Sequence, residues 1–165
     1  MDLRSLLVDI ENLDLIEIER MGRRLYEEIY LKFDAYGVLK SHDGEDVFFW
    51  KKRFDHAFFT SKNRARHPAD KSVLAVDRIM RIRWIEHVIT GRATGSSCYK
   101  AQGPGQAKPF TNRLYVVPSE LFVVWLEPRN EGGWRFSSAY TTLVNDIGRY
   151  CRNAKKIWQY QEKTP

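Results

Sequence analysis

Cysteine, long apolar runs and signal-like segments are scarce in this chain, and each absence excludes a class of protein. Cys98 and Cys151 are the two cysteines among 165 residues, and neither has neighbours at metal-ligand spacing, so we expect neither a disulfide framework nor a zinc site. No apolar run approaches the roughly 18 residues of a membrane span, and the acidic start MDLRSLLVDIENLDL lacks a small-residue cleavage site. The sequence therefore predicts a cytoplasmic protein with reduced thiols, no metal and no cofactor.

Positive charge and aromatic residues, by contrast, are plentiful. Hydrophobic residues make up 43% of the chain, which is enough for one core, so we expect a single domain with appended elements. The formal net charge is +6 and the aromatic content is 13%. A basic surface interleaved with aromatic rings suits the phosphates and stacked bases of RNA. The alternative is a basic protein whose charge has no specific partner.

The charge is unevenly distributed along the chain. Acidic residues outnumber basic ones in residues 1–46, and the reverse holds in residues 47–165. Apolar residues at three-to-four spacing predict a helix over residues 12–36. We therefore divide the chain into an acidic, helical N-terminal arm, residues 1–46, and a basic body, residues 47–165, joined by the loop SHDGED. The arm is expected to bind a partner, to cover the cleft of the body or to pack against the body.

Residues 112–142 predict a compact antiparallel sheet. Three apolar runs, RLYVV, LFVVWLE and WRFSSAY, are separated by turn signals at Pro118-Ser119 and at residues 129–133. The third run ends in clustered hydroxyl groups, and polar groups at a strand end can converge on a ligand. These hydroxyl groups belong to Ser137, Ser138, Tyr140, Thr141 and Thr142.

Shorter patterns assign the remaining elements. Strands are expected at DVFFW, at HAFFT and, as an edge strand, at CYKAQ. Apolar spacing predicts one helix over residues 71–90, lying across the sheet, and a terminal amphipathic helix over residues 141–160. The segments SKNRARHP and GPGQAKPF are expected to be loops, and the first is the segment best suited to contact phosphate.

His56 is the candidate for proton transfer. It follows Asp55 and lies just beyond Lys51, Lys52 and Arg53, which gives it a positive field. A histidine that titrates near neutral pH suits the transesterification of RNA. A purely structural role for His56 is the alternative.

RNA cleavage without a metal needs a base for the 2′-hydroxyl, cations or donors for the phosphate, an acid for the 5′-oxygen and a group that orients the base. Besides His56, the sequence offers arginines for charge, Ser138 or Thr141 as donors, and Tyr140 as stacker or acid. The carboxylates of the basic body are scattered, without the spacing of a two-metal nuclease. The cations expected to contact RNA are Lys51, Lys52, Arg53, Lys62, Arg64, Arg66, Lys100 and Arg135.

The order of these segments resembles a known superfamily. A helix, a His-bearing segment, an RI-containing helix, a YK strand, a strand pair and a closing strand reading WRFSSAYT follow one another. This order resembles the Barnase, EndoU, colicin and RelE superfamily of small metal-independent ribonucleases, and its phage-associated branches look most similar. The resemblance covers roughly residues 47–160. It implies an α+β fold in which a curved antiparallel sheet is flanked by N-terminal, central and C-terminal helices, with an RNA cleft on the concave face.

The resemblance also implies residue roles and partners. His56 looks like the early histidine of the family, Arg113 like its central cation, and Ser138, Tyr140 and Thr141 like its terminal hydroxyl groups, whereas no second histidine matches by motif. Many members are toxins held by antitoxins or toxic tips of larger proteins. The implied partners are therefore RNA and an antitoxin, an immunity protein or a larger phage or defence assembly, and no membrane.

Three classes of function stay open at this point. The first is a metal-independent RNA endonuclease, and the second is a non-catalytic RNA or nucleoprotein binding module on the same sheet, which would show salt-sensitive binding without turnover. The third is an ADP-ribosyltransferase-like transferase, because an arginine strand followed by F-S-S is able to hold a dinucleotide. No Glu-x-Glu pair follows that strand, which weighs against the third class.

Overall fold

The computed structural model describes residues 1–62, 71–103 and 111–163. Its helical segments are η1 (Leu3–Leu6), α1 (Leu15–Tyr26), η2 (Glu27–Leu31), α2 (Arg53–Phe58), α3 (Val76–Met80), α4 (Ile82–Ile89), η3 (Pro118–Glu120) and α5 (Val144–Cys151). Its strands are β1 (Tyr36–Lys40), β2 (Asp46–Trp50), β3 (Phe59–Thr60), β4 (Val73–Leu74), β5 (Ser97–Ala101), β6 (Asn112–Val117), β7 (Phe122–Pro128), β8 (Trp134–Thr141) and β9 (Lys155–Gln159). Within the described ranges no helix is long and apolar enough to cross a bilayer.

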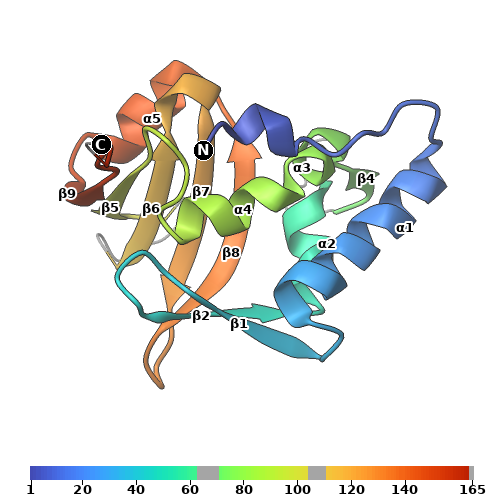
Figure 1. Ribbon diagram of the computed structural model, residues 1–165, viewed down its shortest axis with the longest axis horizontal. Coiled ribbons are helices and arrows are strands. Elements are labelled where there is room, and N and C mark those ends of the chain that lie inside the picture. The colour runs from blue at the N-terminus through green and yellow to red at the C-terminus, as the bar shows by residue number, and fades with distance from the viewer. Residues whose placement is uncertain (63–70, 104–110, 164–165) are drawn as a thin grey trace.

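A seven-stranded sheet in the order β1-β2-β8-β7-β6-β5-β9 forms the centre of the molecule (Figure 1). The expected meander is present as β6, β7 and β8, which pair antiparallel in sequence order. The pairing of β2 with β8 is parallel, and the other pairs in this sheet are antiparallel. The α+β class is therefore confirmed.

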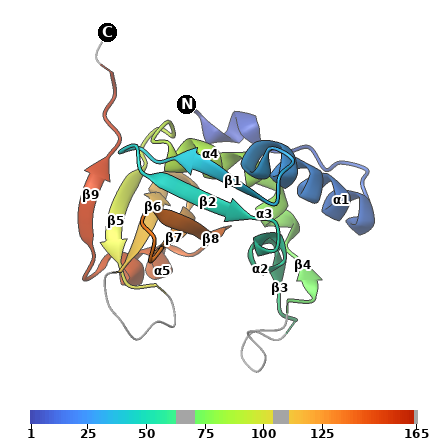
Figure 2. The same cartoon turned by 90° about the horizontal axis from the view of Figure 1, so that it is seen from below.

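The two faces of the sheet carry separate hydrophobic clusters. Alternation along β6 sends Tyr115 and Val117 into the larger cluster, which α4 covers, and sends Leu114 and Val116 into the smaller one. The smaller cluster is covered by α5, and Figure 2 shows α4 and α5 on opposite sides of the sheet. A short two-stranded unit, β3 with β4, projects from the sheet beside α2 (Figure 2).

The acidic residues 1–46 pack on the body as part of its core. Leu3, Ile18 and Leu31 are buried in the larger cluster, and β1 is an edge strand of the main sheet. The loop expected to join two parts, SHDGED, is the turn of the β1–β2 hairpin. The expected arm is thus not set apart from the body in this structure.

The helix expected over residues 12–36 is shorter and ends differently. Asp14 caps α1 through a capping box, and the chain then forms a π-helical segment that stops at Lys32 in a left-handed conformation. Strand β1 follows, and a Cβ on Gly37 would lie 1.7 Å from the carbonyl oxygen of Tyr30. A residue without a side chain is needed there because the strand runs against the backbone of the preceding helix.

Four other predicted elements differ from the structure. The segment HAFFT is largely helix α2, because Phe54, Ala57 and Phe58 are buried at three-to-four spacing. Residues 71–90 form β4, α3 and α4 instead of one helix. The C-terminal helix ends at Cys151, and the following residues form β9, which pairs with β5. Strand β5 is therefore internal to the sheet, since β9 covers the edge that CYKAQ was expected to leave open.

Candidate functional site

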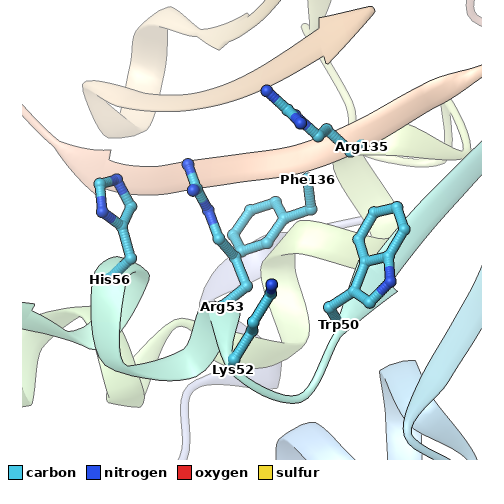
Figure 3. A pocket seen from close by; sticks show the side chains of 6 residues that line it. All are labelled: Trp50, Lys52, Arg53, His56, Arg135 and Phe136. Atoms are coloured by element: carbon cyan, nitrogen blue, oxygen red, sulfur yellow. The ribbon is translucent and has the colours of Figure 1, made fainter. Parts of the chain in front are cut away.

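An open cavity of about 570 Å³ lies where β2 and β8 separate, and its lining contains four of the predicted site residues (Figure 3). A volume of this size is typical of small-ligand sites. The cavity is lined by Trp50, Lys52, Arg53, His56, Arg135 and Phe136. We refer to it as the His56 cavity.

The cavity exists because β2 pairs with β8 over only two positions. Val47 and Phe48 lie opposite Trp134 and Arg135, whereas Phe49 and Trp50 pair with β1 alone, and the chain then turns into α2. The buried face of α2 packs on the core, and His56 lies on its exposed surface towards the cavity. The edge of β8 beyond its contact with β2 is thus bordered by a helix instead of a strand.

A β-bulge in β8 anchors α2 to this edge. Trp125 of β7 lies opposite Ser138 and Leu126 lies opposite Phe136, so Ser137 is the extra residue. Arg53 donates two hydrogen bonds to Ser137, from Nε to the carbonyl oxygen (2.9 Å) and from Nη2 to Oγ (2.8 Å). The sequence predicted that hydroxyls at the end of β8 would contribute to the site, and Ser137 is the one that contacts Arg53.

Glu127 lies between the two arginines of the cavity. It pairs with Arg135 at 2.7 Å and lies 3.9 Å from Arg53, and it accepts a hydrogen bond from Ser137 Oγ (3.1 Å). One carboxylate is therefore shared by two guanidinium groups, and Lys52 adds a third positive charge to the lining. The cavity keeps a surplus of positive charge and suits an anionic ligand.

The electrostatic environment holds His56 in its neutral form. Partial burial, and then the charges of Arg53, Lys71 and Arg78, lower the pKa of His56 to about 4. The negative charge of Glu127 opposes this shift. At neutral pH the ring can therefore accept a proton, but it cannot act as a general acid until it has been protonated.

Arg78 is a cation of this region that the sequence interpretation missed. It is buried and donates from Nη1 to the carbonyl oxygen of Ala57 in α2 (2.9 Å), and its guanidinium lies 5.1 Å from the ring centroid of Tyr140. Arg78 lines a second pocket of about 360 Å³ together with Tyr140 and Thr141, two of the predicted hydroxyl residues. The second pocket shares no lining residue with the His56 cavity. Helix α3 has five residues, too few for apolar spacing to reveal that Arg78 points inward.

Tyr140 is fixed by contacts of its own. Its hydroxyl accepts a hydrogen bond from Trp125 Nε1 (3.1 Å) and lies 3.1 Å from the hydroxyl of Tyr150. Burial and the hydrogen bond to Tyr150 raise its pKa well above the usual range. Tyr140 is thus protonated at neutral pH. Ser138, one position beyond the bulge, is half-buried opposite Trp125.

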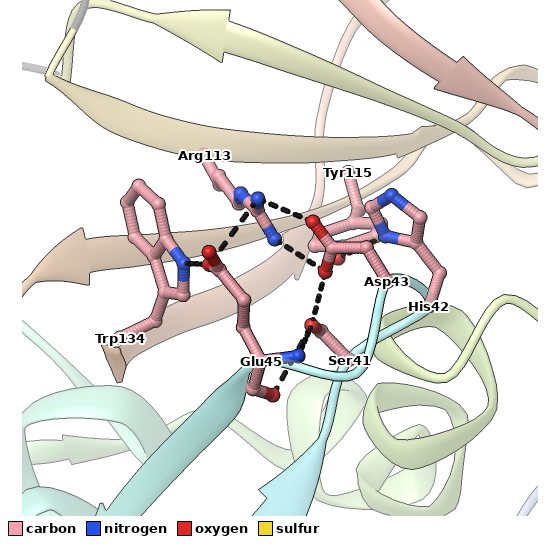
Figure 4. Close-up of polar contacts among 7 residues, drawn as sticks. All are labelled: Ser41, His42, Asp43, Glu45, Arg113, Tyr115 and Trp134. Atoms are coloured by element: carbon pink, nitrogen blue, oxygen red, sulfur yellow. Dashed lines mark hydrogen bonds and ion pairs between the residues drawn. The ribbon is translucent and has the colours of Figure 1, made fainter. Parts of the chain in front are cut away.

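Arg113 lies in a different environment from that of the His56 cavity (Figure 4). It is buried on β6 and forms a two-pronged ion pair with Asp43 (2.9 and 2.7 Å), and Glu45 lies 3.3 Å away. Its guanidinium packs 4.6 Å from the ring centroid of Trp134, whose Nε1 donates to Glu45. Arg113 is absent from the described lining of the His56 cavity. The structure does not bring this predicted central cation next to His56.

The hydrogen bonds of Arg113 also change the acidity of its partner. The Arg113 guanidinium holds the pKa of Asp43 far below its usual range. Asp43 and Glu45 both come from the turn between β1 and β2, so residues that were expected to form a joint hold the sheet together through a buried cation.

The other predicted RNA contacts are dispersed. Lys51 pairs with Glu27 at 3.3 Å, and Lys62 is exposed near the end of the β3 segment. Lys100 lies on β5, three strands from β8. Arg64 and Arg66 lie outside the described residues. Among the described residues, no three His, Cys, Asp or Glu side chains are grouped so that they could hold a metal ion.

The chain has no recognisable relatives in three comparisons. A scan against protein-family models, a search of curated proteins and a search of solved structures each gave no match. Any assignment of function therefore depends on the geometry and charge of the His56 cavity.

Proposed function

We propose that this protein is a metal-independent RNA endonuclease that acts in the cytoplasm and cleaves its substrate in the His56 cavity. The observation that carries the proposal is the placement of a neutral histidine beside Lys52, Arg53 and Arg135 in one open cavity. The three cations suit a phosphodiester, and the neutral ring suits proton abstraction. The resemblance in segment order supports the same reaction class.

The reaction uses a nucleophile that RNA itself supplies. His56 takes the proton of the 2′-hydroxyl, the 2′-oxygen attacks phosphorus, and the bond from phosphorus to the 5′-oxygen breaks. The 5′-oxygen leaves with a proton from water, and His56 returns its proton to the hydroxide that remains, so the products are a 2′,3′-cyclic phosphate and a 5′-hydroxyl. An anionic phosphate beside His56 also raises the pKa of the ring, which makes it a stronger base in the complex than in the free protein.

Positive charge near the phosphate stabilises the transition state. Arg53 is held by Ser137 and Arg135 by Glu127, so both guanidinium groups are positioned before the substrate binds. Arg78, which lines the second pocket, contributes a fixed charge close to Tyr140 and Thr141. The sequence interpretation made Arg113 the central cation, and in its place we assign a supporting role to Arg78.

The test combines a chelator with an end-group analysis. Purified protein is incubated with a fluorescent single-stranded RNA in EDTA, and fragments ending in 2′,3′-cyclic phosphate are expected. The matched control is the same oligonucleotide with 2′-O-methyl groups throughout, which lacks the nucleophile and should stay intact. Loss of cleavage in EDTA, or cleavage of the methylated control, would overturn the proposed mechanism.

A second function is favoured by how far burial and the neighbouring cations lower the pKa of His56. A pKa of about 4 makes the ring a weak base, and a cavity with surplus positive charge can bind RNA without cleaving it. The same assay identifies this case, because RNA would then be retained by the protein, in a salt-sensitive way, with no fragments. An antitoxin or immunity protein that blocked either function would need to present acidic groups to the cavity.

A further inference from the structure

We infer that Trp50 is a stacking platform for an unpaired nucleobase, so that the His56 cavity takes single-stranded RNA in preference to duplex. This inference deepens the proposed function and rests on it for the identity of the ligand. The base is assigned to Trp50, and the phosphate is assigned to Lys52, Arg53 and Arg135. The supporting observations come from the outer face of β2.

Strand β2 carries aromatic side chains on both of its faces. Val47 and Phe49 are fully buried, and the alternate residues Phe48 and Trp50 are partly exposed on the opposite face. The rings of Phe48 and Trp50 lie 5.9 Å apart and are stacked at 27°. Two large rings side by side at the surface are unusual unless something covers them.

Arg129 packs more closely on the ring of Phe48 than on that of Trp50. The Arg129 guanidinium lies 3.7 Å from the ring centroid of Phe48 and 5.6 Å from that of Trp50. Phe48 therefore already has a stacking partner within the protein. Trp50 is the member of the pair that lines the His56 cavity, as Figure 3 shows.

Trp50 is also held in place before any ligand binds. Its carbonyl oxygen accepts a hydrogen bond from the hydroxyl of Tyr26 (2.8 Å), and Tyr26 is buried in the core. The backbone at Trp50 is thus fixed at the position where the chain leaves the sheet. A rigid indole ring on a fixed backbone loses little entropy when a base stacks on it.

The cavity therefore joins the two kinds of group that single strands need. Lys52, Arg53 and Arg135 supply charge for the backbone, and the indole ring of Trp50 supplies a flat apolar surface. Stacking on an aromatic side chain requires a base that is free of its complementary strand, because a paired base presents its faces to its neighbours in the helix. The arrangement thus selects against duplex RNA.

The test separates stacking from phosphate binding. Three probes of one sequence are used: a single-stranded 2′-O-methyl oligonucleotide, its duplex, and a strand of the same length in which the bases are removed. For the unaltered protein we expect tight binding and quenched tryptophan fluorescence with the first probe alone. Trp50→Leu should weaken binding of the first probe about tenfold or more, as expected for one lost stack, and leave binding of the abasic strand unchanged. Trp50→Phe should restore most of the affinity.

Phe48→Leu is the matched control, since Phe48 lies on the same face of β2 but already packs against Arg129. It should change binding of the single strand less than twofold. Equal affinity of Trp50→Leu and the unaltered protein for the single strand would overturn the inference even if EDTA-resistant cleavage is observed. Stacking with no cleavage of ordinary RNA would instead overturn the proposed reaction and leave the base platform intact. Absence of both base stacking and RNA cleavage would overturn both the inference and the proposed function.

Discussion

Two groups of charged residues, one around Arg113 and one in the His56 cavity, show how the partners of an arginine decide its role. Arg113 on β6 is buried against two carboxylates of the β1–β2 turn, Asp43 and Glu45. In the His56 cavity, Arg53 and Arg135 share a single carboxylate, that of Glu127. Positive charge is neutralised in the first group and is in surplus in the second. The first group is suited to hold the fold, and the second is suited to attract an anion.

The largest expected effect of a substitution in the cavity is on cleavage. His56→Ala should lower kcat by about two to four orders of magnitude, the usual size of general acid-base catalysis, and leave the midpoint of thermal unfolding nearly unchanged because His56 belongs to neither hydrophobic cluster. Single-turnover rates and a thermal melt of the same preparation measure the two quantities. A similar loss of rate in Asp43→Asn, at full folding, would show that the Arg113 group belongs to the active site.

In the Arg113 group the expected effect is on stability. Asp43→Asn leaves Arg113 with a weaker partner, and we expect a loss of about 2 kcal/mol in the free energy of unfolding. This is below the roughly 3–5 kcal/mol of a fully buried pair, because Asp43 is partly exposed and Glu45 remains. Urea denaturation measures it. The control is Lys40→Ala, which removes the exposed ion pair with Asp46 and should cost less than about 1 kcal/mol.

Acid should affect the Arg113 group through Asp43. The folded pKa of Asp43 is depressed below its unfolded value of 3.8, so its contribution to stability is fully present above the unfolded value and is lost as the pH falls through the folded one. The stability difference between the unaltered protein and Asp43→Asn should therefore shrink in strong acid. A constant difference down to that range would mean that Asp43 acts through packing alone.

In the His56 cavity the relevant titration is that of the histidine. Because its pKa is lowered to about 4, the free protein should keep His56 neutral down to about pH 5, and the imidazole resonances in an NMR titration should shift with a midpoint near pH 4. In Arg53→Gln the midpoint should rise towards the ordinary value, since a neighbouring charge is removed. A midpoint near 6.5 in the unaltered protein would show that neither burial nor the neighbouring cations lower the pKa of His56.

The smallest expected effect concerns a single phosphate contact. Lys52→Ala should weaken RNA binding and reduce the slope of log K against log salt by about 0.7, the value for one contact with a single strand. Lys155→Ala, on the far edge strand β9, is a control of equal charge change and should leave the slope unaltered. Equal slopes in both variants would indicate that binding is delocalised over the surface.

The sequence predicts the centre of the fold well and its periphery less well. The β6–β8 meander was visible because turn signals separate three long apolar runs. The C-terminal strand β9 was not, because KKIWQ follows an amphipathic helix directly and gains its conformation from pairing with β5. Likewise, β1 is short, and it is a strand because it pairs with β2 across SHDGED. The apolar spacing of its own residues did not indicate this pairing.

For the site, the sequence predicts residue types better than their partners. His56, Lys52, Arg53 and Arg135 were all proposed from their local charge, and the structure brings them to one cavity. The separation of Arg113 from this group was not predictable, because Asp43 lies 70 residues away along the chain. Arg78 was missed for the opposite reason, since its helix is too short to show an inward face.

The extra residue in β8 has a consequence for which changes of length this strand tolerates. Ser137 shifts the alternation of side chains between the two faces of the sheet. Even-numbered residues before it and even-numbered residues after it therefore lie on opposite faces. Removing Ser137 would leave Phe136 opposite Leu126 and Ser138 opposite Trp125 in a regular ladder, so Tyr140 would keep its place, but both hydrogen bonds that Arg53 donates to Ser137 would be lost. Point substitutions leave that phase alone. A deletion at Ser137 would therefore loosen α2 from β8, whereas a substitution there keeps the hydrogen bond from Arg53 to the carbonyl oxygen.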